Sequence, residues 1–188
     1  SSNNDFGVYT SVAVAGVAVT SPAPSSTTTE AGGTVSFDVR LTKAPTASVT
    51  VPVSSSNSSE GTAGTSSLVF TPTDWDVPQT VTVTGQDDSV DDGDTAYTIV
   101  LGSTASADTS YSGLNPDDVN LTNEDDDVAG ISVGTPSGTT TTEAGGTVTF
   151  TVQLTSEPTS DVTLPVSSSD ITEGTVDTAS LTFTSVDW

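Results

Sequence analysis

The sequence predicts an all-β protein built from tandem seven-strand β-sandwiches, the second of which is incomplete. Three observations support this prediction: short apolar runs alternate with polar residues, turn residues separate these runs, and a long block of sequence occurs twice. Alternation at every second position is typical of strands with one buried and one solvated face. Hydrophobic residues make up 32% of the chain and aromatic residues 5%, so the expected core is thin. No stretch has the period of an amphipathic helix.

Seven strands are expected in the first module. The first of them, Val12 to Val19, is apolar at alternate positions on either side of Gly16, which suggests a bulge. The apolar positions that define the following strands are Val35, Phe37, Val39 and Leu41; Val49, Val51 and Val53; Leu68 and Phe70; Val81 and Val83; Tyr97, Ile99 and Leu101; and Val119 and Leu121. Turn residues separate these groups at spacings that suit a sandwich.

A block of sequence recurs at a fixed offset. The string TTEAGGTV at Thr28–Val35 is repeated at Thr141–Val148, so that Glu143 follows Glu30 by 113 residues (143 − 30). Roughly two-thirds of the positions in the repeated block are identical, without a gap. A fixed period of this length is typical of tandem modules that are each close in size to one β-sandwich domain.

The repeat predicts two modules. Residues 1–127 form an N-terminal strand segment and a complete sandwich, and residues 128–188 form the front part of a second module. This second copy lacks counterparts of Asp76 through Asp127, which carry the last three strands of the first. Such a half-sandwich has an open edge. Either the chain continues with further repeats or a neighbouring molecule donates the missing strands, and we favour the first reading because residues 1–20 supply only one or two strands.

The charge excludes several classes of function. The formal charge is −23, from 25 acidic residues against Lys43 and Arg40. This balance repels the phosphates of nucleic acids and anionic lipid surfaces. The chain contains no His and no Cys, so it lacks the usual bases and thiols of nucleophilic catalysis. We therefore predict that the protein is not an enzyme, does not bind nucleic acid and does not insert into membranes.

Acidic residues gather in four connections. In a sandwich of antiparallel strands, alternate connections lie at the same end, or pole. One pole should therefore contain the connections that follow the first, third and fifth strands and the residues that follow the seventh. The acidic residues of these connections are Glu30, Glu60, Asp87, Asp88, Asp91, Asp92, Asp94 and Glu124 to Asp127. Carboxylates this close together require a counter-ion, and calcium takes six to eight oxygen ligands from flexible loops. The sequence therefore favours calcium at this pole, over the alternative of solvated surface charges.

Four stretches resemble a known family. They are EAGGTVSFDVRLT at Glu30–Thr42, EGTA at Glu60–Ala63, FTPTDWDVPQTVTVTGQDDSVDDGDTAYTIVL at Phe70–Leu101 and NEDDDVAGI at Asn123–Ile131. Together they are similar to the Calx-β family, and most closely to the Calx-β-type repeats of large bacterial surface proteins. The resemblance implies an immunoglobulin-like seven-strand sandwich and, in calcium-binding members, ligands at one pole.

The resemblance also implies a set of metal ligands. Carried over by position, these ligands are Glu30, Glu60, Asp87, Asp88, Asp92, Asp125, Asp126 and Asp127. The chain departs from the family pattern at Thr95, where members commonly have Glu, so one ligand is expected to be missing.

The threonine runs at Thr27–Thr29 and Thr139–Thr142 are interpreted as flexible linkers, with O-glycosylation as the alternative. Taken together, the sequence predicts a structural module of an extracellular fibre or bacterial surface stalk. The module is expected to be rigidified by calcium and to assemble with itself along a filament axis. The alternative is a ligand-binding adhesin that recognises glycans or host surface proteins.

Overall fold

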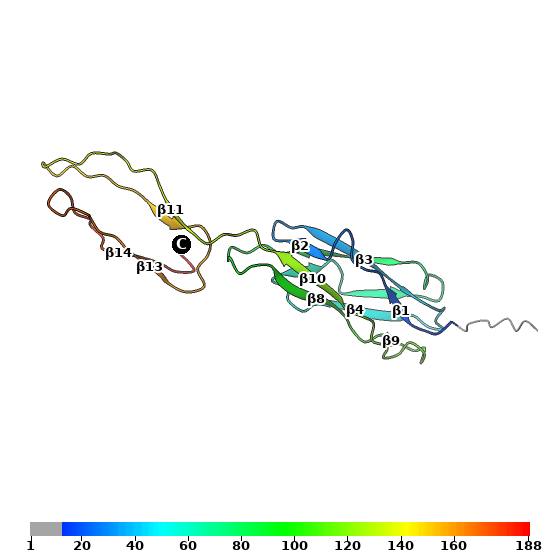
Figure 1. Ribbon diagram of the computed structural model, residues 1–188. Coiled ribbons are helices and arrows are strands. Elements are labelled where there is room, and N and C mark those ends of the chain that lie inside the picture. Colours follow the sequence, from blue (N-terminus) through cyan, green and yellow to red (C-terminus); the bar gives the residue numbers. More distant parts are fainter. Residues whose placement is uncertain (1–12) are drawn as a thin grey trace, which may run out of the picture. The chain divides into compact units, whose positions relative to one another are not determined.

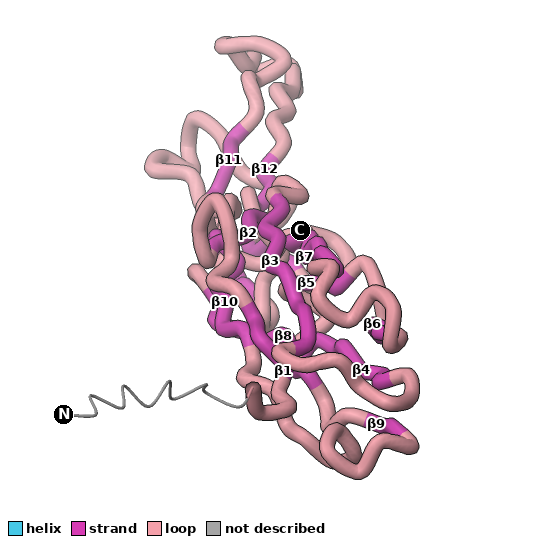
Figure 2. The backbone as a smooth tube through the Cα atoms, turned by 90° about the vertical axis from the view of Figure 1, so that its right-hand side faces the viewer, coloured by secondary structure: helices cyan, strands magenta, loops and turns pink. Residues whose placement is uncertain are grey.

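The computed structural model describes residues 13–188. Over these residues the chain consists of strands and loops without a helix (Figures 1 and 2), which confirms the predicted all-β class. No membrane-spanning helix is therefore found in this part of the chain. The backbone divides into two compact units, the first extending to Asp87 and including Asp94–Glu124, the second made of Asp88–Gly93 and Asp125–Trp188.

The first unit contains two β-sheets and has the layered character of a β-sandwich. One sheet has the strand order β1-β3-β7-β5, with bounds Val17–Val19, Thr34–Leu41, Gln79–Gly85 and Gly61–Ala63. The other has the order β2-β10-β8-β4-β6, with bounds Thr27–Thr29, Val119–Glu124, Thr95–Leu101, Val49–Ser55 and Ser67–Phe70. The short strand β9 (Ala105–Ser106) also pairs with β4. Neighbouring strands are antiparallel except β2 and β10, which are parallel.

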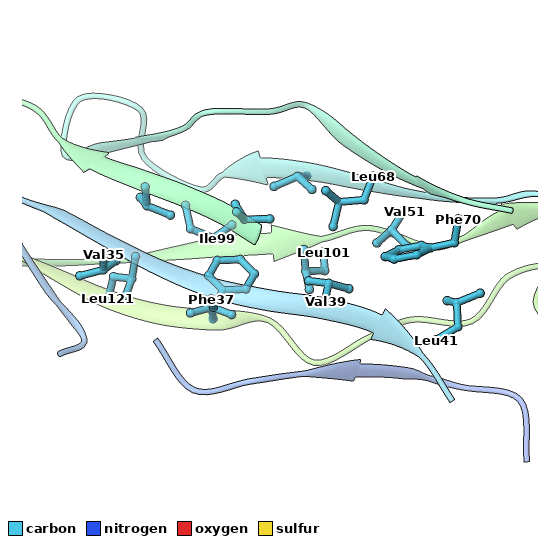
Figure 3. Packing of buried hydrophobic residues seen from close by; sticks show 14 of the residues in the cluster. Val35, Phe37, Val39, Leu41, Val51, Leu68, Phe70, Ile99, Leu101 and Leu121 are labelled. Carbon is cyan, nitrogen blue, oxygen red and sulfur yellow. The ribbon is translucent and has the colours of Figure 1, made fainter. Parts of the chain in front are cut away.

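The core of the first unit lies between these sheets. Alternate residues of β3 are buried, as the period-two pattern predicts, and the intervening ones face outward. Phe37 and Val39 of β3 belong to the same buried cluster as Phe70 and Ile99 of the opposite sheet (Figure 3). Phe70 and Ile99 are both 0% exposed, and burying a side chain of this size stabilises a fold by about 1.5–3 kcal/mol.

The observed strands include every apolar group that the sequence assigned to the first unit, with two differences. The first predicted strand is shorter than expected, because β1 covers only Val17–Val19; Val12 lies outside the described residues. The linker interpretation of Thr27–Thr29 is wrong. These residues form β2, which pairs with Thr122–Glu124 of β10 and buries Thr28 completely.

The second unit has fewer strand pairings. Strand β11 (Ile131–Val133) pairs with β12 (Val152–Leu154), and β13 (Val162–Pro165) pairs with β14 (Ser180–Phe183). Leu154 and Phe183 are its buried apolar side chains among the described residues.

Candidate metal centre

The acidic connections that follow β2, β4, β7 and β10 begin next to one another at one end of the first unit's sheets. The backbone amide of Glu30, just after β2, donates to the carbonyl of Glu124 at the end of β10 (3.0 Å). The amide of Gln86, just after β7, donates to the carbonyl of Glu60 in the β4–β5 connection (3.0 Å). These bonds link the connections in two pairs, in agreement with the direction of the strands.

A tight turn carries Glu30 into the interior. Gly32 has a φ of +81°, a conformation that glycine adopts without strain. The amide of Gly33 donates to the side-chain oxygen of Thr29 (3.1 Å), which closes the turn. As a result the Glu30 side chain is only 4% exposed, an unusual position for a carboxylate.

A buried polar network lies next to this turn. The Thr28 hydroxyl donates to Oδ1 of Asn123 (2.9 Å) and lies 2.9 Å from the Tyr97 hydroxyl, which therefore donates to Thr28. The Asn123 amide nitrogen donates to the carbonyl of Gln86 (2.9 Å). Asn123 thus links the residues that lie just before Glu30, Asp87 and Glu124, where three acidic stretches begin. Burial raises the pKa of Tyr97, an effect that the nearby carboxylate of Glu60 increases.

Two glycines allow the close approach of these strands. A Cβ atom on Gly61 would collide with the Tyr97 ring. A Cβ atom on Gly85 would collide with the carbonyl oxygen of Thr29 and with Oδ1 of Asn123. Glycine at both positions therefore lets β5 and β7 pack directly beneath the acidic connections.

Five of the predicted ligands form two groups of carboxylates that can hold a metal ion. Glu30, Asp87 and Asp126 make one group, and Glu30, Asp125 and Asp127 make the other. Within each group the carboxylate oxygens lie within 4.8 Å of one another. Glu30 is common to both, and Asp125 and Asp127 are half-buried. Oxygen-only sites of this kind suit hard cations.

The other three predicted ligands are not part of either group. Glu60 is 6% exposed and lies in the connection that bonds to Gln86. Asp88 accepts a hydrogen bond from the amide of Val90 (2.8 Å), and the amide of Asp92 donates to the Val90 carbonyl (2.8 Å). These two aspartates therefore order their own loop.

The repeat places two further glutamates at equivalent positions in the second copy. Glu143 is the counterpart of Glu30, and Glu173 is the counterpart of Glu60. Both are exposed, and within the described residues neither belongs to a group that can hold a metal.

The polar network is the part of this end that sequence reasoning missed. Thr28 and Asn123 stand in β2 and β10, where polar residues are expected to face solvent, and the buried face predicted for Tyr97 did not include its hydroxyl bond to Thr28. Gly61 and Gly85 were the available signal, since glycine within a strand indicates a close approach of another group. No protein-family model matches this chain, and a search of curated proteins also finds no match.

Proposed function

We propose that the chain is a structural module of an extracellular fibre or surface stalk, rigidified by Ca²⁺ bound to Glu30 and its neighbouring aspartates. The observation that carries the proposal is the pair of carboxylate groups that share the buried Glu30. A buried carboxylate among other carboxylates is costly unless a cation or hydrogen bonds compensate its charge.

The chemistry of the ligands favours calcium over other common metals. The chain has no His or Cys, which are the preferred ligands of zinc and copper. Calcium accepts six to eight oxygen ligands with irregular geometry, which loops can supply, whereas magnesium requires a nearly ideal octahedron. A divalent cation would also offset part of the formal charge of −23.

A scaffold role agrees with the repeat and the composition. A repeat that keeps one 113-residue offset from Thr28 to Trp75 is typical of extended arrays, in which each module is one structural unit. The tandem immunoglobulin-like arrangement of Calx-β-type surface proteins is the architecture that the sequence resembles. In that architecture bound calcium would order residues 125–127, through which the chain leaves β10, and so restrict bending along the array.

Thermal unfolding of the full chain tests the metal. We expect Ca²⁺ at about 100 times its dissociation constant to add about 2.7 kcal/mol of stability relative to excess chelator, a rise in Tm of roughly 10 °C. Glu30→Gln should remove most of this rise. Glu143→Gln is the matched control, because it makes the same change at the exposed counterpart. Equal melting temperatures in calcium and in chelator would contradict the calcium site.

Electron microscopy tests the fibre. At high protein concentration with calcium present, we expect uniform filaments with a regular subunit spacing. Isolated particles under the same conditions, together with binding to surface glycans or proteins, would instead support a ligand-binding adhesin.

A further inference from the structure

The second unit contains an acidic loop, Asp88–Gly93, that accepts hydrogen bonds from residues before β11 and after β12. The amide of Ala129 donates to Oδ2 of Asp91 (2.7 Å). The amide of Glu157 donates to the carbonyl of Ser89 (2.6 Å). Two backbone donors, one before β11 and one after β12, therefore hold the loop at both sides of Val90.

Val90 makes the apolar part of this contact. It is half-buried, although it lies in the middle of an acidic loop. Together with Ile131 of β11 and Leu154 of β12 it lines a cavity of about 520 Å³ within the second unit. The loop thus combines two hydrogen bonds from backbone amides, one to a carboxylate and one to a carbonyl, with one apolar side chain. This pattern does not depend on the side chains of the donor residues.

The first unit repeats the backbone of this binding surface. Val14-Ala15-Gly16-Val17 corresponds to Val128-Ala129-Gly130-Ile131. In the first unit Val17 pairs with Leu41, and in the second Ile131 pairs with Leu154, so the register is the same. The flanking hydrogen bonds also agree: the amide of Thr42 donates to the carbonyl of Gly16 (2.9 Å), and the amide of Thr155 donates to the carbonyl of Gly130 (3.0 Å).

The two loop-binding donors have counterparts in the first unit. They are the backbone amides of Ala15, equivalent to Ala129, and of Ala44, equivalent to Glu157. Within residues 13–188, neither of these amides donates a hydrogen bond. Ala44 is exposed, Ala15 is half-buried, and the adjacent Val14 is 79% exposed. Ala44, and Val14 next to Ala15, thus lie at the surface, whereas Ala15 itself packs partly against the core.

The charges at the first surface suit an acidic loop better than those at the second. Lys43 and Ala44 replace Ser156 and Glu157, and Ser48 replaces Asp161. Side-chain charge over these three positions is therefore +1 in the first unit and −2 in the second. Lys43 is exposed beside the Ala44 amide. The Asp108 carboxylate, which accepts from the Thr46 amide (2.8 Å), adds one negative charge at the first surface. An acidic loop therefore meets one favourable and one repulsive charge there, against two repulsive charges in the second unit.

We propose that this front surface of the first unit, Val14–Val17 with Lys43–Ser48, docks the acidic loop of another copy of the repeat. The loop carries the pattern Asp-Asp-Ser-Val-Asp-Asp, and its Ser carbonyl and third Asp carboxylate accept from Ala44 and Ala15. Docking of this kind joins repeats front to back. This docking would be the contact by which repeats assemble along the filament axis, so its biological meaning rests on the proposed function. The docking does not require bound calcium.

NMR with a loop peptide tests the docking directly. The probe is a blocked peptide of residues 86–95, added to the ¹⁵N-labelled full chain in chelator and about 0.3 M salt, which screens long-range repulsion between acidic molecules. Two hydrogen bonds from backbone amides and one small apolar contact predict a dissociation constant on the order of 1 mM. We expect saturable downfield shifts of the Ala15 and Ala44 amide protons.

Charge variants sharpen this test. Lys43→Glu should weaken peptide binding at least tenfold, whereas Arg40→Glu, which makes the same charge change on β3, should leave it nearly unchanged. A peptide with Val90→Gly should bind more weakly than the parent. The proposal is overturned if the Ala15 and Ala44 amides do not shift at about ten times the expected dissociation constant, if only Ala129 and Glu157 respond, or if the shifts lie elsewhere. Because chelator is present, these outcomes do not depend on whether the calcium site exists.

Discussion

The first and second units contain similar strand sequences but bury them to different extents. Phe37 of β3 is 2% exposed, while its counterpart Phe150 is 48% exposed. In the first unit β7 pairs with β3 from Thr34 to Val39. Of the equivalent residues 147–152 in the second copy, only Val152 lies in a strand, β12. Burial of an apolar strand face therefore depends on the strands that cover it, even where the face itself is the same.

Local turns, in contrast, are the same in both units. Gly32 and Gly145 have φ angles of +81° and +89° in matching turns. The amide of Thr71 donates to Oδ1 of Asp74 (2.6 Å), and the amide of Thr184 donates to Oδ1 of Asp187 (3.0 Å). These hydrogen bonds span only three residues, so they form without help from distant strands. Comparison of the two copies thus shows that the turns form from local sequence alone, whereas burial of the strands requires strands that are distant in sequence.

The largest expected difference concerns the core phenylalanines. Phe37→Ala should lower the free energy of unfolding of the first unit by about 3–5 kcal/mol, because it leaves a cavity between two sheets. Phe150→Ala should cost less than about 1 kcal/mol, because its side chain is half in water. Urea unfolding followed by NMR intensities of each unit measures both changes. Similar losses at the two positions would show that the second copy is buried as well as the first.

A glycine pair gives the next largest effect. Gly61→Ala should destabilise the first unit by about 1–3 kcal/mol, because the added methyl group meets the Tyr97 ring. At the counterpart Gly174 no atom lies within 4 Å of an added Cβ, so Gly174→Ala should change stability by no more than about 1 kcal/mol. The same unfolding experiment applies. A tolerated alanine at position 61 would contradict the close packing beneath the acidic connections.

The buried amide should give a smaller but still measurable loss. Asn123→Ala removes one hydrogen bond from the Thr28 hydroxyl, which keeps its bond to Tyr97, and removes the bond to the Gln86 carbonyl, which together should cost about 1–3 kcal/mol. Asn120→Ala on the same strand is the control, because Asn120 is exposed and should change stability by less than about 0.5 kcal/mol. Thermal melting in chelator compares the two variants. Equal effects would mean that the network does not stabilise the first unit.

The smallest effect is the acid titration of the repeated turns. The hydrogen bonds from Thr71 lower the pKa of Asp74 below 3.8, and those from Thr184 lower that of Asp187 in the same way. A lowered pKa in the folded state means that this stabilisation is present above about pH 4 and is lost as the pH falls through the depressed pKa. Carbonyl-detected NMR should show both carboxyl groups titrating below their usual range. An ordinary pKa at Asp187 alone would show that the turn needs the complete first-unit environment.

The alternation of apolar residues was sufficient to predict the longer strands. Each of β3, β4, β7, β8 and β10 contains the apolar residues assigned to it, because one face of each strand is buried. The short strands β2, β5 and β9 contain Thr, Gly, Ala and Ser rather than alternating apolar residues. Their pairing depends on neighbours distant in sequence, which a local pattern does not record.

The candidate metal centre was predictable only in part, for a similar reason. Strand direction brings the connections of Glu30, Glu60 and Gln86 to one end of the first unit, as expected. Which carboxylates approach one another depends on the course of each loop. Asp88 and Asp92 bond within their own loop, and their side chains do not join the groups that contain Glu30. The spacing of acidic residues alone does not show whether a carboxylate joins a group with Glu30 or bonds within its own loop.

The parallel pairing of β2 with β10 has a mechanical consequence. A tensile load that reaches the start of β2 and the end of β10 pulls these two strands in opposite directions along their common axis. The ladder from Thr27–Thr29 to Thr122–Glu124 then resists in shear, so its hydrogen bonds must break together rather than one after another. Under a load applied at these two points, the threonine strand that was interpreted as a linker resists stretching of the first unit.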